Sequence, residues 1–334
     1  MIKDFPVGDS LHLIDLGLMK KCLLGWRDGK FGNYRTKWSA SDVSSITRKL
    51  HQLKMPLEIH RAVRGLDCLA HWKGLEFRTF LHYISIVVLK EHLPSDVYEH
   101  FLALFCGVTI CSSNEYGYLL DVAHKLLLHY VEYYGDIYGE DYITSNVHNL
   151  NHLVDDVKRF GILSKFSAYP FENKLYKLKN FIRSGNRPLV QLAKRIGEAN
   201  KFCEPPQSIE HSYPSLKTPI TEENGKNHFA QIQLVGFSLR NDFVNKWFLT
   251  QKNELVEMIY AFENDEFVIS GRPLKTLNLF FTTPIRSSFL HIYVASLQYN
   301  EPRTFRTSEI KCKMIPIPHG SKGDIVFIPL LHTL

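Results

Sequence analysis

The chain has 334 residues, of which 45% are hydrophobic and 22% are charged. This composition is typical of a globular protein and excludes an intrinsically disordered one, and the length allows two domains with cores of their own. The 40 Lys and Arg residues outnumber the 34 Asp and Glu residues, so the net charge is +6. The longest apolar runs, 83–89 and 101–110, are shorter than the about 20 residues of a membrane-spanning helix. We therefore expect no membrane partner.

The six cysteines are scattered and include no Cys-x-x-Cys pair. This spacing argues against a zinc ribbon and against a disulfide scaffold. The N-terminal residues MIKDFPVGDS also lack the cationic leader and apolar core of a secretory signal. We expect a protein of the nucleus or the cytoplasm that is not secreted.

Apolar residues recur at intervals of three and four from about residue 9 to residue 201, which predicts a mainly helical N-terminal part. Proline at position 188 supports the start of the last helix, because proline is tolerated in a first turn. The expected helices are 11–25, 41–53, 77–92, 96–111, 115–137, 147–160, 171–183 and 188–201.

The amino-acid composition of the chain changes after residue 202. Pro, Ser, Thr and Glu dominate residues 203–227, which predicts a linker between a domain at 1–202 and a small β-rich domain at 228–334. The fold class expected for the whole chain is thus α+β. Short runs separated by Gly, Pro and Asn predict strands at 229–237, 246–250, 267–269, 277–281, 289–295, 310–317 and 324–329.

Asp9 and His12 form an Asp-x-x-His motif at the start of the first predicted helix. Residues separated by one helical turn can face the same cavity. Asp9 is therefore a candidate ligand of a divalent metal ion, and His12 is a candidate ligand or proton carrier. The alternative is a helix-capping aspartate beside a packed histidine.

A second candidate lies in NVHNLNHLVDDVKRFG, where His148, His152 and Asp155 share one stripe of a predicted helix. Two imidazoles and a carboxylate are suitable metal ligands. The alternative is the solvated face of an amphipathic helix, whose opposite side would pack on the core. That opposite side comprises Val147, Leu150, Val154 and Val157.

The third candidate is the basic segment 164–195, which contains the acid Glu172. Residues 162–201 hold nine Lys and Arg against two Asp and Glu, a net charge of +7. Such a surface suits a polyanion such as DNA. A surface helix with no ligand is the alternative. On a helix, Phe171, Leu175, Leu178 and Ile182 would form the buried stripe. The candidate DNA-binding residues are Lys174, Lys177, Lys179, Arg183, Arg187, Lys194 and Arg195.

The motifs GDSLH, GLMKKCLLGW, GLEFRTFLHY, NVHNLNHL and YPFENKLYKLK occur in this order between about residues 6 and 202. Together they resemble the C-terminal portion of the transposases of CACTA-type DNA transposons and their host-resident relatives. The tail that ends in VFIPLLHTL looks like the companion domain of animal members. Asn173 departs from the pattern, because relatives commonly carry Arg there.

The resemblance implies a ribonuclease-H-like core with a helical insertion, in which three acids hold two Mg²⁺ or Mn²⁺ ions. By motif, Asp9 matches the second acid, His12 its accompanying histidine and Glu172 the last acid. His148 and His152 match a histidine pair that is a further candidate for metal binding. The first acid belongs upstream of Asp9, and Asp4 is too close to Asp9 to occupy a separate strand.

We therefore expect a transposon-derived DNA-binding protein, either a catalytically incomplete remnant or a fragment of a metal-dependent transposase, with homo-oligomers as a further option. One alternative is an active Mg²⁺-dependent nuclease or strand transferase that an upstream segment or a partner chain completes. The other is a protein-interaction scaffold, in which the basic helix meets an acidic protein.

Overall fold

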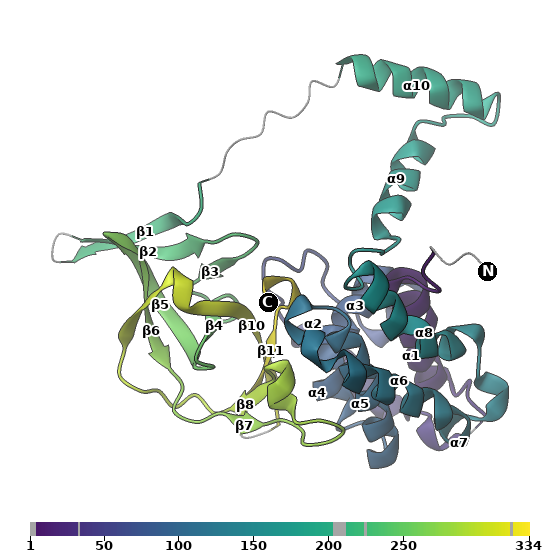
Figure 1. Ribbon diagram of the computed structural model, residues 1–334, viewed down its shortest axis with the longest axis horizontal. Coiled ribbons are helices and arrows are strands. Elements are labelled where there is room, and N and C mark those ends of the chain that lie inside the picture. The colour runs from purple at the N-terminus through teal and green to yellow at the C-terminus, as the bar shows by residue number, and fades with distance from the viewer. Residues whose placement is uncertain (1–4, 33, 203–211, 224–225, 321–322) are drawn as a thin grey trace. The chain divides into compact units, whose positions relative to one another are not determined.

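A computed structural model describes residues 5–32, 34–202, 212–223, 226–320 and 323–334 (Figure 1). Asp4 and residues 203–211 of the expected linker lie outside the described residues. The chain divides into two compact units, of which the first combines Met1–Phe166 with Tyr213–Leu334 and the second is Ser167–Ser212. The first unit is α+β, with helices before residue 167 and an antiparallel sheet after residue 214. This division differs from the expected one, which separated residues 1–202 from residues 228–334.

The helices of the first unit follow the apolar periodicity of the sequence. The main ones are η1 (Ser10–Met19), α1 (Lys20–Asp28), α2 (Ala40–Gln52), α3 (Gly74–Thr79), η4 (Phe80–Ile84), α4 (Ser85–Leu89), α5 (Ser95–Ile110), α6 (Leu120–Glu132), α7 (Tyr134–Tyr138) and α8 (Ser145–Phe160). Short helical turns are η2 (Tyr34–Thr36), η3 (Leu66–His71), η5 (Asn114–Leu119) and η6 (Glu140–Tyr142). The six helices predicted before residue 161 are confirmed, although the structure divides three of them into shorter segments, and η2, η3 and η6 were not predicted. No strand occurs among the described residues before 203, and the ribonuclease-H-like core stays a prediction.

Helix α8 shows why this periodicity was informative. Val147, Leu150, Val154 and Val157 are all buried, as their spacing predicts. An apolar side chain at every third or fourth position forms one stripe of a helix, and burying that stripe stabilises the helix more than its intrinsic propensity does.

In the part of the chain that the structure describes, the sheet has 11 strands and its pairings are antiparallel. Its main path runs β1–β2–β5–β4–β10–β11–β8–β7, while β3 pairs with β2 and β6 joins β5 to β9. The strands are β1 (Ser215–Glu223), β2 (Lys226–Gln233), β3 (Ser238–Arg240), β4 (Trp247–Thr250), β5 (Leu255–Asn264), β6 (Glu266–Pro273), β7 (Asn278–Leu279), β8 (Tyr293–Ala295), β9 (Arg303–Arg306), β10 (Ile310–His319) and β11 (Asp324–Pro329). Three further helical turns are η7 (Ser287–Leu290), η8 (Thr307–Glu309) and η9 (Leu331–Thr333).

Several strand predictions need correction. Strand β1 occupies residues that the composition assigned to the linker, and β3, β5 and β9 were not predicted. Residues 287–290, partly predicted as strand, form a helical turn instead. Strand β9 pairs with β6, which is not its neighbour in the chain, and β3 has only three residues. Strand β1 contains Pro and Glu, which are depleted in strands.

The helices and the sheet of the first unit share one hydrophobic core. Leu290, Ile315 and Val326 from the C-terminal part belong to the same buried cluster as Phe80 and Phe101. Two smaller clusters of buried residues belong to the sheet part alone, one around Trp247 and one around Phe248. Because apolar burial is the main favourable term in folding, we infer that the sheet and the helices fold as one body.

The second unit contains α9 (Tyr169–Asn180) and α10 (Pro188–Phe202), and both predicted helices are confirmed. Each helix has proline in its first turn, where the missing N–H costs no hydrogen bond. The expected buried stripe of α9 is wrong in this structure, because Phe171 is 71% exposed, Leu175 is 58% exposed and Ile182 is 38% exposed. Among the described residues of this unit, no apolar side chain is buried.

Candidate functional site

Asp9 and His12 lie in direct contact at the start of η1. Asp9 Oδ1 accepts hydrogen bonds from the backbone N–H groups of Leu11, at 2.8 Å, and His12, at 3.3 Å. Asp9 Oδ2 lies 2.9 Å from His12 Nδ1. Asp9 therefore acts as the helix cap that its position allowed, and it also orients the imidazole. The His12 side chain is 56% exposed, so it is not a packed core residue.

Helix α8 lies beside η1 and runs antiparallel to it. Near one end, the Val7 N–H donates to Asp156 Oδ2 at 2.7 Å. Near the other end, Gly17 approaches Asn146 so closely that an added Cβ would lie 2.5 Å from the Asn146 side chain. The structure thus brings together the two helices that carry Asp9 and the histidine pair.

His148 and His152 are both exposed on α8, and their ring centroids are 5.7 Å apart. Asp155 is exposed as well, which agrees with the stripe that these three residues were predicted to share. Asp156 is buried instead, where its carboxylate holds the Val7 backbone. Among the described residues, no group of three or more His, Cys, Asp or Glu side chains has the arrangement of a metal site.

A buried polar cluster next to η1 was missed at the sequence level. Asp15 is 1% exposed and His82 of η4 is 6% exposed. Both line a cavity of about 10 Å³ with Arg78, which has room for about one water molecule. Burial lowers the pKa of His82 to about 3, with the Arg78 charge as a second cause, so His82 is neutral at physiological pH. The only available signal was a carboxylate inside the apolar run LIDLGL, which does not reveal that Arg78 and His82 line the same cavity.

Glu172 belongs to the second unit, whereas Asp9, His12, His148 and His152 belong to the first. It lies in the first turn of α9 and is exposed, as are most of the cations that follow it. The exposed cations are Lys174, Lys177, Lys179, Arg183, Arg187 and Lys194, and Arg195 is half-buried.

The turn between α9 and α10 is built around Gln191. Its Oε1 accepts from the Arg183 backbone N–H at 3.1 Å, and its Nε2 donates to Ser184 Oγ at 3.0 Å. Arg187 has a φ of 47°, in the left-handed region that non-glycine residues rarely adopt. These contacts give the turn a defined shape.

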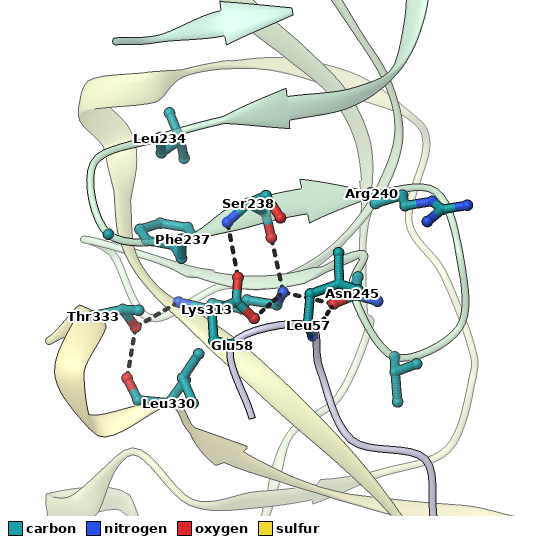
Figure 2. Close-up of polar contacts among 12 residues, drawn as sticks. Leu57, Glu58, Leu234, Phe237, Ser238, Arg240, Asn245, Lys313, Leu330 and Thr333 are labelled. Carbon is teal, nitrogen blue, oxygen red and sulfur yellow. Dashed lines mark hydrogen bonds and ion pairs between the residues drawn. The ribbon is translucent and has the colours of Figure 1, made fainter. Parts of the chain in front are cut away.

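A second buried polar cluster surrounds the Lys313 ammonium on β10 (Figure 2). Lys313 is fully buried, and its Nζ donates to Glu58 Oε2, Ser238 O and Asn245 Oδ1, each at 2.8 Å. Glu58 Oε1 also accepts from the Ser238 N–H at 2.9 Å. Burial lowers the pKa of Lys313, and the Glu58 charge opposes this effect. Since all three ammonium donors are used, this lysine fastens the sheet to the segment after α2.

We compared the chain with known proteins. The family described as "Domain of unknown function (DUF8592)" matches residues 214–330, which contain the strands of the sheet. Searches of the curated proteins and of the solved structures found no match. Among the described residues, no helix is both long enough and apolar enough to span a membrane.

Proposed function

We propose that this chain is a transposon-derived DNA-binding protein and that the second unit makes the DNA contacts. The supporting observation is the surface of α9 and of the turn that follows it, where Lys174, Lys177, Lys179, Arg183 and Arg187 are all exposed. DNA carries one phosphate charge per about 1.7 Å of its axis, so a run of exposed cations gains affinity by displacing condensed counterions. Such binding needs no metal ion and no base contact, and it is weak and tolerant of sequence.

The proposal also includes the transposase resemblance, in which the chain is a catalytically incomplete remnant or a fragment. Both carboxylate oxygens of Asp9 already have hydrogen-bond partners, which supports a structural role in this chain. If the site is completed, Asp9 and Glu172 would hold Mg²⁺ or Mn²⁺, and His148 and His152 are further candidate ligands. A DNA-binding role would suit a nuclear location and is compatible with homo-oligomers.

Binding of the full chain to a fluorescently labelled DNA duplex, measured by anisotropy at several salt concentrations, tests the proposal. We expect log K to fall linearly with log salt concentration, without a requirement for Mg²⁺. Simultaneous charge reversal at Lys177, Lys179 and Arg183 should weaken binding at least about tenfold and reduce the salt slope. Lys252→Glu, at an exposed position in the sheet part, is the matched control and should have no effect. Binding that is independent of salt, or unchanged in the triple variant, would refute the proposal.

An active nuclease is the second candidate, and the Asp9–His12 contact is the observation that favours it. The 2.9 Å contact orients the imidazole beside a carboxylate, as a metal-dependent hydrolase would need. Cleavage of DNA in Mg²⁺ or Mn²⁺ by the product of the full-length transcript, lost in Glu172→Gln, would establish this function.

A protein-interaction scaffold is the third candidate. Exposed Phe171, Leu189 and Val190 lie among the cations of the second unit, and large exposed apolar side chains are common at protein interfaces. Capture of an acidic protein that survives nuclease treatment and is lost in Phe171→Ser would favour this function over DNA binding.

A further inference from the structure

A pocket of about 360 Å³ opens on the first unit between the start of α1 and Tyr142. Leu16, Leu24 and Phe31 supply its apolar lining. Phe31 is 2% exposed, and its ring meets the Tyr142 ring at a centroid distance of 5.7 Å and an interplanar angle of 85°. An added Cβ at Gly25 would lie 1.9 Å from the Phe31 ring, so glycine at this position lets the ring lie against α1. The apolar side of the pocket is therefore well packed.

Three lysines line the same pocket, and no acidic residue is among its lining residues. Lys21 is half-buried, donates to the Tyr142 carbonyl and lies 3.5 Å from Thr144 Oγ1, so its position is fixed. Lys20 is half-buried, and Lys30 is 66% exposed with only a 3.7 Å contact to Asp28. Lys20 and Lys30 can therefore turn toward an anion, because neither is held by a close ion pair within the described residues.

We propose that this pocket binds a nucleoside monophosphate, either free or at the end of a DNA strand. Lysine ammonium groups bind phosphate as point charges, and Lys20 and Lys30 would hold it while the nucleoside lies against Leu16 and Leu24. The volume is near the lower end of the range for ligand pockets, which suits one nucleotide. The pocket belongs to the first unit and does not depend on the proposed DNA binding by α9 and α10.

Isothermal titration calorimetry on the full chain can test this assignment with three probes. Thymidine 5′-monophosphate should bind, whereas thymidine and inorganic phosphate should each bind at least about tenfold more weakly. Thymidine or phosphate binding as tightly as the nucleotide would overturn the assignment, and so would the absence of nucleotide binding. Lys20→Glu and Lys30→Glu should each weaken nucleotide binding at least about tenfold.

Further measurements separate a loss of binding at this pocket from a loss of folding. Lys252→Glu should bind the nucleotide like the unmodified chain, and the thermal unfolding of Lys20→Glu and Lys30→Glu should match it. Leu16→Trp fills the apolar side without changing charge and should also abolish binding. Nucleotide binding that persists in Lys20→Glu, Lys30→Glu and Leu16→Trp would overturn the proposal.

The same titration in the Lys177, Lys179 and Arg183 charge-reversal variant removes the contribution of α9. If this variant binds a short 5′-phosphorylated oligothymidylate more tightly than the free nucleotide, the ligand is the end of a DNA strand. Tighter binding of the free nucleotide would assign a soluble ligand. Loss of all nucleotide binding in this variant would overturn the assignment to the first unit.

Discussion

Lys313 in the first unit and Lys177 in the second unit carry the same charge in opposite surroundings. Lys313 is fully buried, and three oxygen atoms at 2.8 Å surround its ammonium group. Lys177 is exposed on α9. A buried charge must be paired to offset its desolvation, whereas an exposed charge stays solvated and can meet a partner from outside. The difference teaches that surroundings decide what a lysine can do: the Lys313 charge maintains the fold, whereas the exposed Lys177 charge is accessible to a partner.

The strongest test of this comparison is Lys313→Met, which keeps most of the length of the side chain and removes its charge. Glu58 would then keep a largely buried carboxylate without its cation, so we expect a loss of about 3–5 kcal/mol in the free energy of unfolding. Denaturant unfolding measures this loss. The double variant with Glu58→Gln should be less destabilised than Lys313→Met alone. Lys177→Met is the matched control and should change stability by no more than about 0.5 kcal/mol. Equal effects at positions 313 and 177 would break the comparison.

A pH titration sharpens the comparison, because the buried His82 has a folded-state pKa of about 3 against an ordinary value of 6.5. Between these values the unfolded chain binds a proton that the folded chain does not, so stability is lost as the pH falls from about 6.5 to about 3. The expected contribution is about 2 kcal/mol between pH 7 and pH 5. His82→Leu should reduce the pH-dependent loss of stability by this amount. No histidine occurs in residues 167–202, so the α9–α10 segment contributes nothing of this kind. An unchanged pH dependence in the variant would contradict the buried, neutral state of His82.

The smallest expected effect concerns the cap at Asp9. Asp9→Ala should cost about 1 kcal/mol, because the N–H groups of Leu11 and His12 lose their acceptor. Asp9→Ser keeps an acceptor and should recover most of this loss in thermal unfolding. If Ser were as damaging as Ala, the carboxylate would have a role beyond capping, and the metal-site interpretation of Asp9 would gain weight.

The helices could be predicted from the sequence because their signal is local. The buried side of α8 needs only the spacing of Val147, Leu150, Val154 and Val157, and proline at position 188 indicated the start of α10. Strand β9 was missed because it pairs with β6, which is not adjacent to it in the chain. Strands β3 and β5 pair with neighbours in the chain, and β3 has only three residues, which is too short to show an alternating pattern.

In the candidate site too, contacts between residues close in the sequence were predictable and contacts between distant residues were not. The Asp9–His12 contact spans three residues and was predictable, whereas Lys313 and Glu58 are 255 residues apart in the sequence. The apolar stripe of α9 has the right spacing for burial, but spacing alone does not supply a surface to cover it. The DNA-binding and metal-binding roles of the predicted residues stay predictions.

The chain leaves the first unit after Phe166 and returns to it at Tyr213, so the second unit is an insertion with both ends tied to one body. A single peptide-bond cut within this insertion would leave two fragments that the shared core and the Lys313–Glu58 pair still hold together. The insertion can therefore gain, lose or exchange sequence while its attachment points stay fixed. The matched domain at 214–330 has no such freedom, because removing it would uncover the apolar side chains that fill the core of the helices.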